Sequence, residues 1–383
     1  MRLTRPAKPP ARPFTVRELW HIARNPSRRA PRAADVLTPQ AAPRGVPGDV
    51  ASGRAFISLG GAWRLRDVRL VAVQQYIGEL VRCPHLSHLH RLDLSGNRIG
   101  DAAVAELAAS PFVPELLELV LSGNDLSKPP EMPNLTALDV SNNPLRSFEF
   151  PRGLQRLGAS GCGLTVESLA PLTSLAELDV SSNALGPSGA DALAGLSLPL
   201  RRLDLSFNDI ESAGAEALAF DDLVSLTLRA NRIAATDGLA ESPHFGNVEE
   251  LDLAVNPIGD RGVVALLRGE AFGSLTRLDV SNCGITDVGV AGLCASGTLG
   301  GLRELSLAWN PVGDAAVRAL VACPDLAGLR SLDLTGTRIT FAGAIALADS
   351  LHFNLRTLTL GENHRLPPDA VRMLGERVGT ITA

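Results

Sequence analysis

The chain has 383 residues, of which 45% are hydrophobic and 20% charged. This balance allows a large buried core and excludes a wholly disordered chain or a small disulfide-stapled scaffold. The net charge of −5 is uneven, because residues 1–50 hold ten Arg or Lys against three acidic residues, which leaves −12 for the rest. No run of 18 apolar residues and no apolar signal core occurs, so we predict no membrane partner and a cytoplasmic location.

Residues 1–54 differ in composition from everything that follows. Their first 50 positions contain nine prolines and ten basic residues, a composition that cannot bury enough apolar area to fold. We therefore predict a disordered basic Pro/Arg-rich tail, whose role, functional, autoinhibitory or targeting, the sequence leaves open.

One template, L-x-x-L-x-L-x-x-N/C-x-L, returns twelve times from Leu89 onward. Its two closely spaced leucines alternate with outward residues, as in a short strand with one buried face. The copies begin at Leu89, Leu116, Leu135, Leu154, Leu175, Leu200, Leu223, Val248, Leu275, Leu302, Leu329 and Leu355.

The turn position of each copy carries a residue that can pair backbone groups left open where the chain turns inward. An amide offers both a donor and an acceptor, whereas Cys and Thr do so more weakly. The amides are Asn97, Asn124, Asn143, Asn183, Asn208, Asn231, Asn256, Asn310 and Asn363, and Cys162, Cys283 and Thr337 replace them in the other copies.

Repeat length predicts which copies carry a helix. Repeats of 25 to 27 residues have room for one, as in GDAAVAELAAS from Gly100 and TDVGVAGLCAS from Thr286, each with Asp or Thr as N-cap. The 19-residue repeats and their prolines exclude one. Residues 55–88 are predicted to be an N-terminal capping repeat, because LRDVRLVAVQQYIGELVRCPHLSHL matches the later DAAVRALVACPDLAGL, and residues 89–383 the repeat domain.

The long repeats, with LDLS strands followed by N-x-I-G-D, resemble the ribonuclease-inhibitor-like subfamily of leucine-rich repeats, and the short ones resemble bacterial and Sds22-type repeats. The resemblance implies an α/β leucine-rich-repeat solenoid, a horseshoe with a concave parallel sheet of about twelve short strands and helices on the convex side. It also implies a role in holding another macromolecule, usually a protein.

The central outward position of the strands is acidic in seven of twelve copies, and these residues are candidates for binding a partner with a basic surface. They are Asp93, Asp139, Asp179, Asp204, Asp252, Asp279 and Asp333. The alternative is that LDLS is simply the common strand consensus. In the column two residues earlier, opposite charges alternate (Arg156, Glu177, Arg202; Glu250, Arg277, Glu304), which predicts pairing among themselves.

Phe207 and Trp309 stand just before the turn asparagine, where most of the other copies have Gly, Ala or Ser. They are candidate anchors for a partner, or they pack on the neighbouring loop.

No catalytic, metal or cofactor motif is found: His85, His88 and His90 lack further ligands, and GDVASGR from Gly48 lacks the Lys and Ser or Thr of a phosphate loop. We predict a monomeric, non-enzymatic, protein-binding scaffold without cofactor, in which the repeat domain binds no nucleic acid. Two alternatives stay open: a regulator of a small GTPase, resembling the Ran GTPase activator, and nucleic-acid or acidic-surface binding through the basic tail.

Overall fold

The computed structural model describes residues 54–59, 62–69, 74, 77–81, 87, 89–111, 113–350, 354–364, 366–375 and 380–382. The predicted tail therefore lies outside the described residues except for Arg54, as do parts of the predicted capping repeat, His85 and His88. The chain divides into two compact units, Met1–Leu164 and Thr165–Ala383. Among the helices of the described residues, none is long and apolar enough to cross a membrane.

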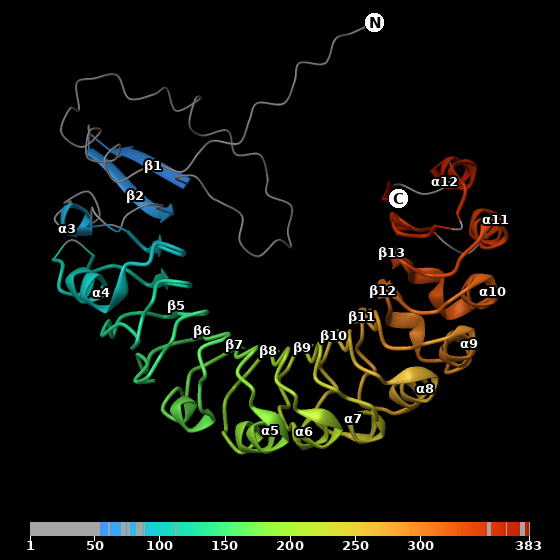
Figure 1. Ribbon diagram of the computed structural model, residues 1–383, viewed down its shortest axis with the longest axis horizontal. Coiled ribbons are helices and arrows are strands. Elements are labelled where there is room, and N and C mark those ends of the chain that lie inside the picture. Colours follow the sequence, from blue (N-terminus) through green and yellow to red (C-terminus); the bar gives the residue numbers. More distant parts are fainter. Residues whose placement is uncertain are drawn as a thin grey trace, which may run out of the picture. The chain divides into compact units, whose positions relative to one another are not determined.

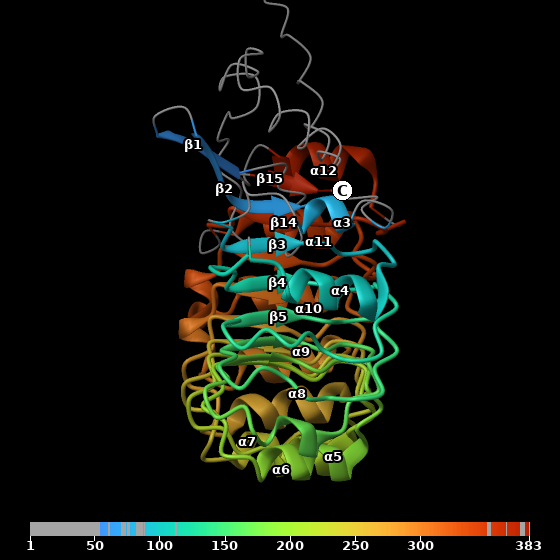
Figure 2. The ribbon, with the colours of Figure 1, turned by 90° about the vertical axis from the view of Figure 1, so that its left-hand side faces the viewer.

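The first unit is a small sheet whose strands follow one another in chain order. β1 and β2 pair antiparallel, with Arg54 opposite Asp67, and from β2 to β6 each strand pairs in parallel with the next. Figure 2 shows β2 to β5 stacked one above the other. The elements are β1 (Arg54–Leu59), β2 (Ala62–Arg69), α3 (Ile77–Leu80), β3 (Arg91–Asp93), α4 (Gly100–Ala108), β4 (Glu118–Val120), β5 (Ala137–Asp139) and β6 (Arg156–Gly158).

The second unit repeats one strand and, in most copies, one helix. Its strands are β7 (Glu177–Asp179), β8 (Arg202–Asp204), β9 (Ser225–Thr227), β10 (Glu250–Asp252), β11 (Arg277–Asp279), β12 (Glu304–Ser306), β13 (Ser331–Asp333), β14 (Thr357–Thr359) and β15 (Thr380–Thr382). Its α-helices are α5 (Gly186–Ala194), α6 (Glu211–Ala217), α7 (Asp237–Glu241), α8 (Gly259–Arg268), α9 (Asp287–Cys294), α10 (Asp314–Val321), α11 (Phe341–Asp349) and α12 (Pro368–Gly375). Within this unit the strands lie on the inner side and the helices on the outer side of an arc (Figure 1).

The twelve predicted strands are β3 to β14, and β1, β2 and β15 are additional strands outside the repeat pattern. The strand leucines are buried, as predicted: Leu92, Leu226 and Leu332 are fully inaccessible. Residues 113–185, all of which the structure describes, contain no α-helix and only the 3-10 helix η2 (Val166–Leu169). The short repeats therefore lack a helix, in agreement with their length.

The predicted N-caps need a partial correction. Thr286 does cap α9, where its hydroxyl accepts from the Val288 N–H at 3.2 Å. The aspartates instead lie in the first helical turn and bind the next repeat: Asp260 accepts from the N–H and hydroxyl of Thr286, both at 2.7 Å. These carboxylates link their own helix to the following repeat and do not cap it.

The turn asparagines form a ladder that links successive repeats. The N–H of Asn183 donates to Oδ1 of Asn208 at 2.8 Å, and the N–H of Asn208 donates to Oδ1 of Asn231 at 2.9 Å. The Nδ2 of Asn208 donates to the carbonyls of Val180 and Leu205, one repeat back and in its own repeat. All nine turn asparagines are buried, and an unpaired amide there would cost free energy.

The replacements Cys283 and Thr337 offer weaker groups than an amide, as the residue types predicted. The thiol of Cys283 donates to the Leu253 carbonyl at 3.2 Å, and the Cys283 N–H still donates to Oδ1 of Asn310. The Thr337 hydroxyl lies 2.9 Å from the Leu334 carbonyl and 2.9 Å from Oδ1 of Asn363. The ladder thus continues through these positions with weaker groups.

We predict that Asn256→Ala lowers the free energy of unfolding by about 3 kcal/mol, because it leaves several buried backbone groups unpaired. These are the N–H groups of Asn231 and Ile233 and the carbonyl of Leu228. Cys283→Asn restores an amide and should raise the same quantity by about 1 kcal/mol. Thermal and urea unfolding measure both changes, and a stabilised Asn256→Ala would contradict the ladder.

Candidate functional site: the acidic inner face

The structure places the seven candidate aspartates at the ends of strands in both units. Asp93 and Asp139 belong to β3 and β5 of the first unit, and the other five to β7, β8, β10, β11 and β13 of the second. All seven are half-buried. Asp179 and Asp204 lie opposite each other on adjacent strands, and so do Asp252 and Asp279.

Each of these aspartates has a local structural role that the sequence did not reveal. Its Oδ1 accepts a hydrogen bond from the N–H two residues later, for example from Ser206 to Asp204 at 2.8 Å and from Ala254 to Asp252 at 2.8 Å. The same bond occurs at Asp93, Asp139, Asp179, Asp279 and Asp333. Such turns favour Asp because its short side chain reaches its own backbone, so the LDLS consensus has a physical cause.

The turn bond uses only one carboxylate oxygen. Within the described residues, Oδ2 of Asp204, Asp252 and Asp279 has neither a hydrogen bond nor an ion pair. Asp93 differs, because Arg69 lies 3.4 Å from its Oδ2. The acceptors open to a partner are therefore concentrated on the second unit.

Burial and repulsion between like charges destabilise the ionised form of Asp252. Burial, followed by the carboxylate of Asp279, raises its pKa from 3.8 to about 6. The Arg229 guanidinium acts in the opposite direction but more weakly than Asp279. Burial, with a smaller contribution from Asp179, also raises the pKa of Asp204.

The neighbouring column forms ion pairs, as its alternating charges predicted. Arg277 lies 3.5 Å from Glu250 and 3.2 Å from Glu304, and Arg202 lies 3.5 Å from Glu250. In the first unit Glu118 pairs with Arg91 and Arg156. Two expected pairs are missing, because Glu177 forms no ion pair within the described residues. Arg202 instead reaches across β9 to Glu250, and Arg156 pairs with Glu118. These exposed pairs contribute about 0–1 kcal/mol each.

A hollow of about 410 Å³ lies over β9 to β14 on the inner face. Asp252, Asp279 and Asp333 line it together with Glu250 and Glu304, against a single guanidinium, that of Arg277. The two glutamates were not among the sequence candidates, because their column looked neutral. The hollow is therefore strongly acidic.

The position just before the turn residue has a backbone constraint in all twelve repeats. Its φ is positive everywhere, from 52° at Asn282 to 68° at Gly96, a conformation that glycine and asparagine adopt most readily. Phe207 and Trp309 hold it at 58° and 57°, and each side chain is 56% exposed. The frequency of Gly and Asn at this position was the sequence signal for the constraint.

Trp309 also packs on the next repeat, as the alternative interpretation expected. A methyl group added at Gly336 would lie 2.5 Å from its Cε3, so the indole rests against that glycine. The contact fixes the ring while more than half of its surface stays exposed.

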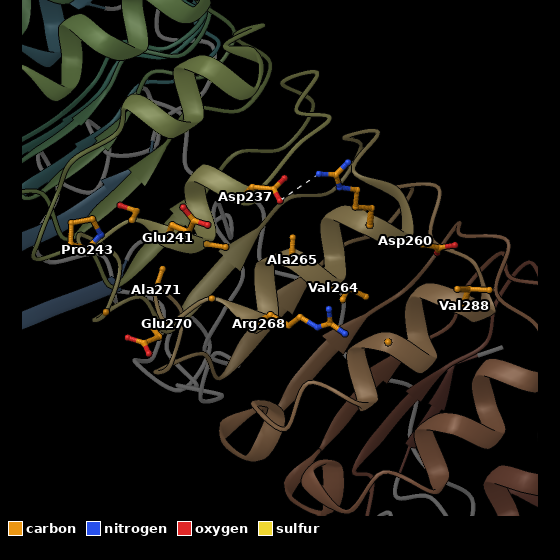
Figure 3. Close-up of a pocket in the computed structure, with 16 residues that line it drawn as sticks. Asp237, Glu241, Pro243, Asp260, Val264, Ala265, Arg268, Glu270, Ala271 and Val288 are labelled. Carbon is orange, nitrogen blue, oxygen red and sulfur yellow. Dashed lines mark ion pairs between the residues drawn. The ribbon is translucent and has the colours of Figure 1, made fainter.

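A second hollow, of about 1150 Å³, lies among the helices of the second unit, between α7, α8 and α9 (Figure 3). Ala240, Val264 and Val288 give it apolar patches, and Asp237 pairs with Arg261 at 3.9 Å. Both acidic and basic side chains line this hollow.

The metal-ligand and nucleophile candidates of the described part of the chain lie apart from the acidic hollow or are not activated. No cluster of three His, Cys, Asp or Glu there could hold a metal. His244 bonds Asp221 at 2.7 Å, but this carboxylate is 82% exposed. Burial raises the thiol pKa of Cys283 and of Cys294 to about 12, so neither is an activated nucleophile.

Family comparisons agree with the repeat geometry. A family model described as Leucine Rich repeat matches residues 85–108, 172–194, 197–219, 247–267, 274–294, 302–321 and 329–348, and another, Leucine Rich Repeat, matches residues 134–157. These segments contain β3, β5, β7, β8, β10, β11, β12 and β13 with the turns that follow them. The chain belongs to the leucine-rich-repeat superfamily.

Its curated relatives are much longer proteins. Tonsoku-like protein of Bos taurus is 39% identical over 110 residues, which cover 29% of this chain and 6% of the relative. Toll-like receptor 2 type-2 of Gallus gallus is 30% identical over 202 residues, which cover 49% of this chain and 25% of the relative. The chain thus spans a quarter or less of the length of these relatives.

The structural comparison found leucine-rich-repeat proteins. The crystal structure of a TLR13–ssRNA13 complex matches 83% of this chain and 49% of that chain, with a TM-score of 0.55 and 22% identity. An internalin (inlF) from Listeria monocytogenes matches 76% of this chain and 85% of its own, with a TM-score of 0.47 and 19% identity. The first match supports an α/β leucine-rich-repeat solenoid and no more specific conclusion.

We predict that Asp252→Asn stabilises the protein at pH 7.5 by about 2–3 kcal/mol and leaves its stability unchanged near pH 3.5. The native carboxyl holds its proton up to about pH 6, whereas the unfolded one loses it near 3.8. The native state therefore binds more protons between these values, and its stability falls as pH rises through them.

Asp333→Asn is the matched control, because Asp333 accepts the same turn bond but faces Ser306 and Thr359 on its neighbouring strands. Urea unfolding at several pH values measures both variants. Equal pH dependence for wild type and Asp252→Asn would contradict the electrostatic account.

Proposed function

We propose that this protein is a non-enzymatic, protein-binding scaffold that holds a basic surface of its partner on the inner face of the second unit. The observation that carries the proposal is the acidic hollow, in which five carboxylates face one guanidinium. Family membership supports a binding role.

A basic partner would relieve the electrostatic cost of this face. Asp252 and Asp279 oppose each other on adjacent strands, and Oδ2 of each lacks a donor within the described residues. A Lys or Arg side chain from a partner would supply donors and an opposite charge, and charge-assisted bonds of this kind are among the stronger hydrogen bonds. Binding would then relieve the repulsion between Asp252 and Asp279 in the free protein, and this relief would add to the affinity.

The same charges favour a protein over a nucleic acid as partner of the repeat domain. A phosphate backbone would meet the carboxylates of Glu250, Asp252 and Asp279 and be repelled. Of the nine sequence candidates, the proposal keeps Asp179, Asp204, Asp252, Asp279, Asp333, Phe207 and Trp309. It sets aside Asp93, which Arg69 already pairs, and Asp139, which belongs to the first unit.

The remaining expectations from the sequence stay predictions. The small-GTPase alternative has no supporting contact on this face, and residues 1–53 of the basic tail lie outside the described residues. Monomeric state and cytoplasmic location are likewise predictions that size-exclusion chromatography with light scattering and cell fractionation would measure.

A labelled nona-arginine peptide provides a direct probe of the face. We predict that replacing Asp204, Asp252 and Asp279 together by Asn weakens its binding at least tenfold, and that wild-type binding weakens steeply with added salt. Fluorescence anisotropy measures both effects.

The control variant replaces Glu216, Glu241 and Glu270 by Gln. It removes the same charge from exposed positions in α6, in α7 and after α8. Equal weakening in both triple variants would mean that net charge alone binds the probe, and the proposal would be wrong.

A further inference from the structure

The left-handed backbone row of the second unit carries large side chains where the geometry favours glycine. From β8 to β12 this turn row comprises Phe207, Ala230, Val255, Asn282 and Trp309, with φ between 52° and 60°. A left-handed conformation costs a side-chain-bearing residue about 1–2 kcal/mol, and β-branched Val255 is among the least suited to it. Strain of this kind at exposed positions is a pointer to function.

The turn row is a continuous edge with an apolar residue at each end. The N–H of Phe207 donates to the Arg229 carbonyl and that of Trp309 to the Thr335 carbonyl, and the residues between make equivalent bonds to the next repeat. Both aromatic side chains are 56% exposed, and Gly336 supports the indole. Rigid, exposed aromatics lose little conformational entropy when they bind.

The acidic face adjoins the turn row. Asp204, Asp252 and Asp279 stand three residues before Phe207, Val255 and Asn282, and their turn bonds to the intervening backbone hold them beside the row. Arg229, which precedes Ala230, lowers the pKa of Asp252, but its effect is smaller than the opposite effect of Asp279. A ligand on the row would thus meet two aromatic ends with carboxylates between them.

We propose that the turn row binds an extended, basic protein segment that places one apolar side chain on Phe207 and another on Trp309. Four strand intervals of about 4.8 Å separate the two aromatics, so they stand about 19 Å apart. An extended chain covers that distance in about six residues. The segment would therefore carry Lys or Arg within a stretch of about six residues that ends in aliphatic or aromatic side chains.

This inference rests on the proposed function, which assigns the acidic face to a protein partner. What it adds is the distance between two apolar contacts, which depends on Phe207 and Trp309, two residues outside the hollow. Phe207→Asn with Trp309→Asn removes both anchors, and Asn already occupies this position at 142 and 282 with φ of 57° and 52°. The double variant should therefore keep or raise the melting temperature, so lost binding would not reflect unfolding.

A displayed library of random twelve-residue peptides, selected on the full chain, tests the proposal. We expect enriched peptides to contain Lys or Arg between two apolar residues about six positions apart. Their affinity should fall at least tenfold with the double variant and also with the Asp204, Asp252 and Asp279 triple variant. Val288→Asn, which changes a 72% exposed apolar residue on α9, should leave affinity unchanged.

The outcomes separate the two proposals. If the triple variant loses affinity while the double variant binds as wild type does, the turn row is not the anchor, and the acidic face alone binds the segment. If neither variant loses affinity, if the enriched peptides are acidic, or if no peptide is enriched, both proposals are wrong. Preference for single-stranded polynucleotides over peptides would contradict both as well.

Discussion

The side-chain amide that follows nine of the twelve repeat strands is the interaction on which the rest of this structure depends. In each repeat the chain turns inward there, and its backbone groups are buried where water cannot pair them. One asparagine, such as Asn208, serves its own repeat through Nδ2 and the preceding repeat through Oδ1. Because each amide binds two repeats, the strands are held in register whether or not a helix accompanies them, and the short repeats 113–185 keep the same turn without an α-helix.

This turn also determines the chemistry of the inner face. The backbone must enter a left-handed conformation at the residue just before the asparagine. The aspartate three residues before that left-handed residue closes the turn through Oδ1. Residues needed for folding are thus brought into a row of like charges, as Asp252 and Asp279 are on adjacent strands. The neighbouring Arg and Glu side chains pair among themselves and do not neutralise it. The inner face is consequently an acidic surface whose repulsion is compensated by the ladder and the leucine core.

Much of this could be predicted from the sequence because the repeat is short and its spacing has a direct physical meaning. The buried leucines, the turn amides, the long-repeat helices and the absence of helix in the short repeats all follow from periodicity and length. The antiparallel β1–β2 pair and β15 could not, because they lie outside the template. The sequence did not reveal the role of Asp260, because this carboxylate bonds a residue of the next repeat, 26 residues away. In the site, the columns of charge were evident, but the turn bonds of the aspartates, the hollow and the support of Trp309 by Gly336 depend on side-chain packing between repeats.

The central claim is that partners bind the inner face and turn row of the second unit and leave its helices free. Hydrogen–deuterium exchange of the full chain with and without nona-arginine tests it most directly, because it reports every segment at once. The account predicts added protection in the peptides that contain residues 204–209, 252–257 and 279–284, and none in α7, α8 or α9. Added protection confined to those helices, or spread evenly over the chain, would contradict it.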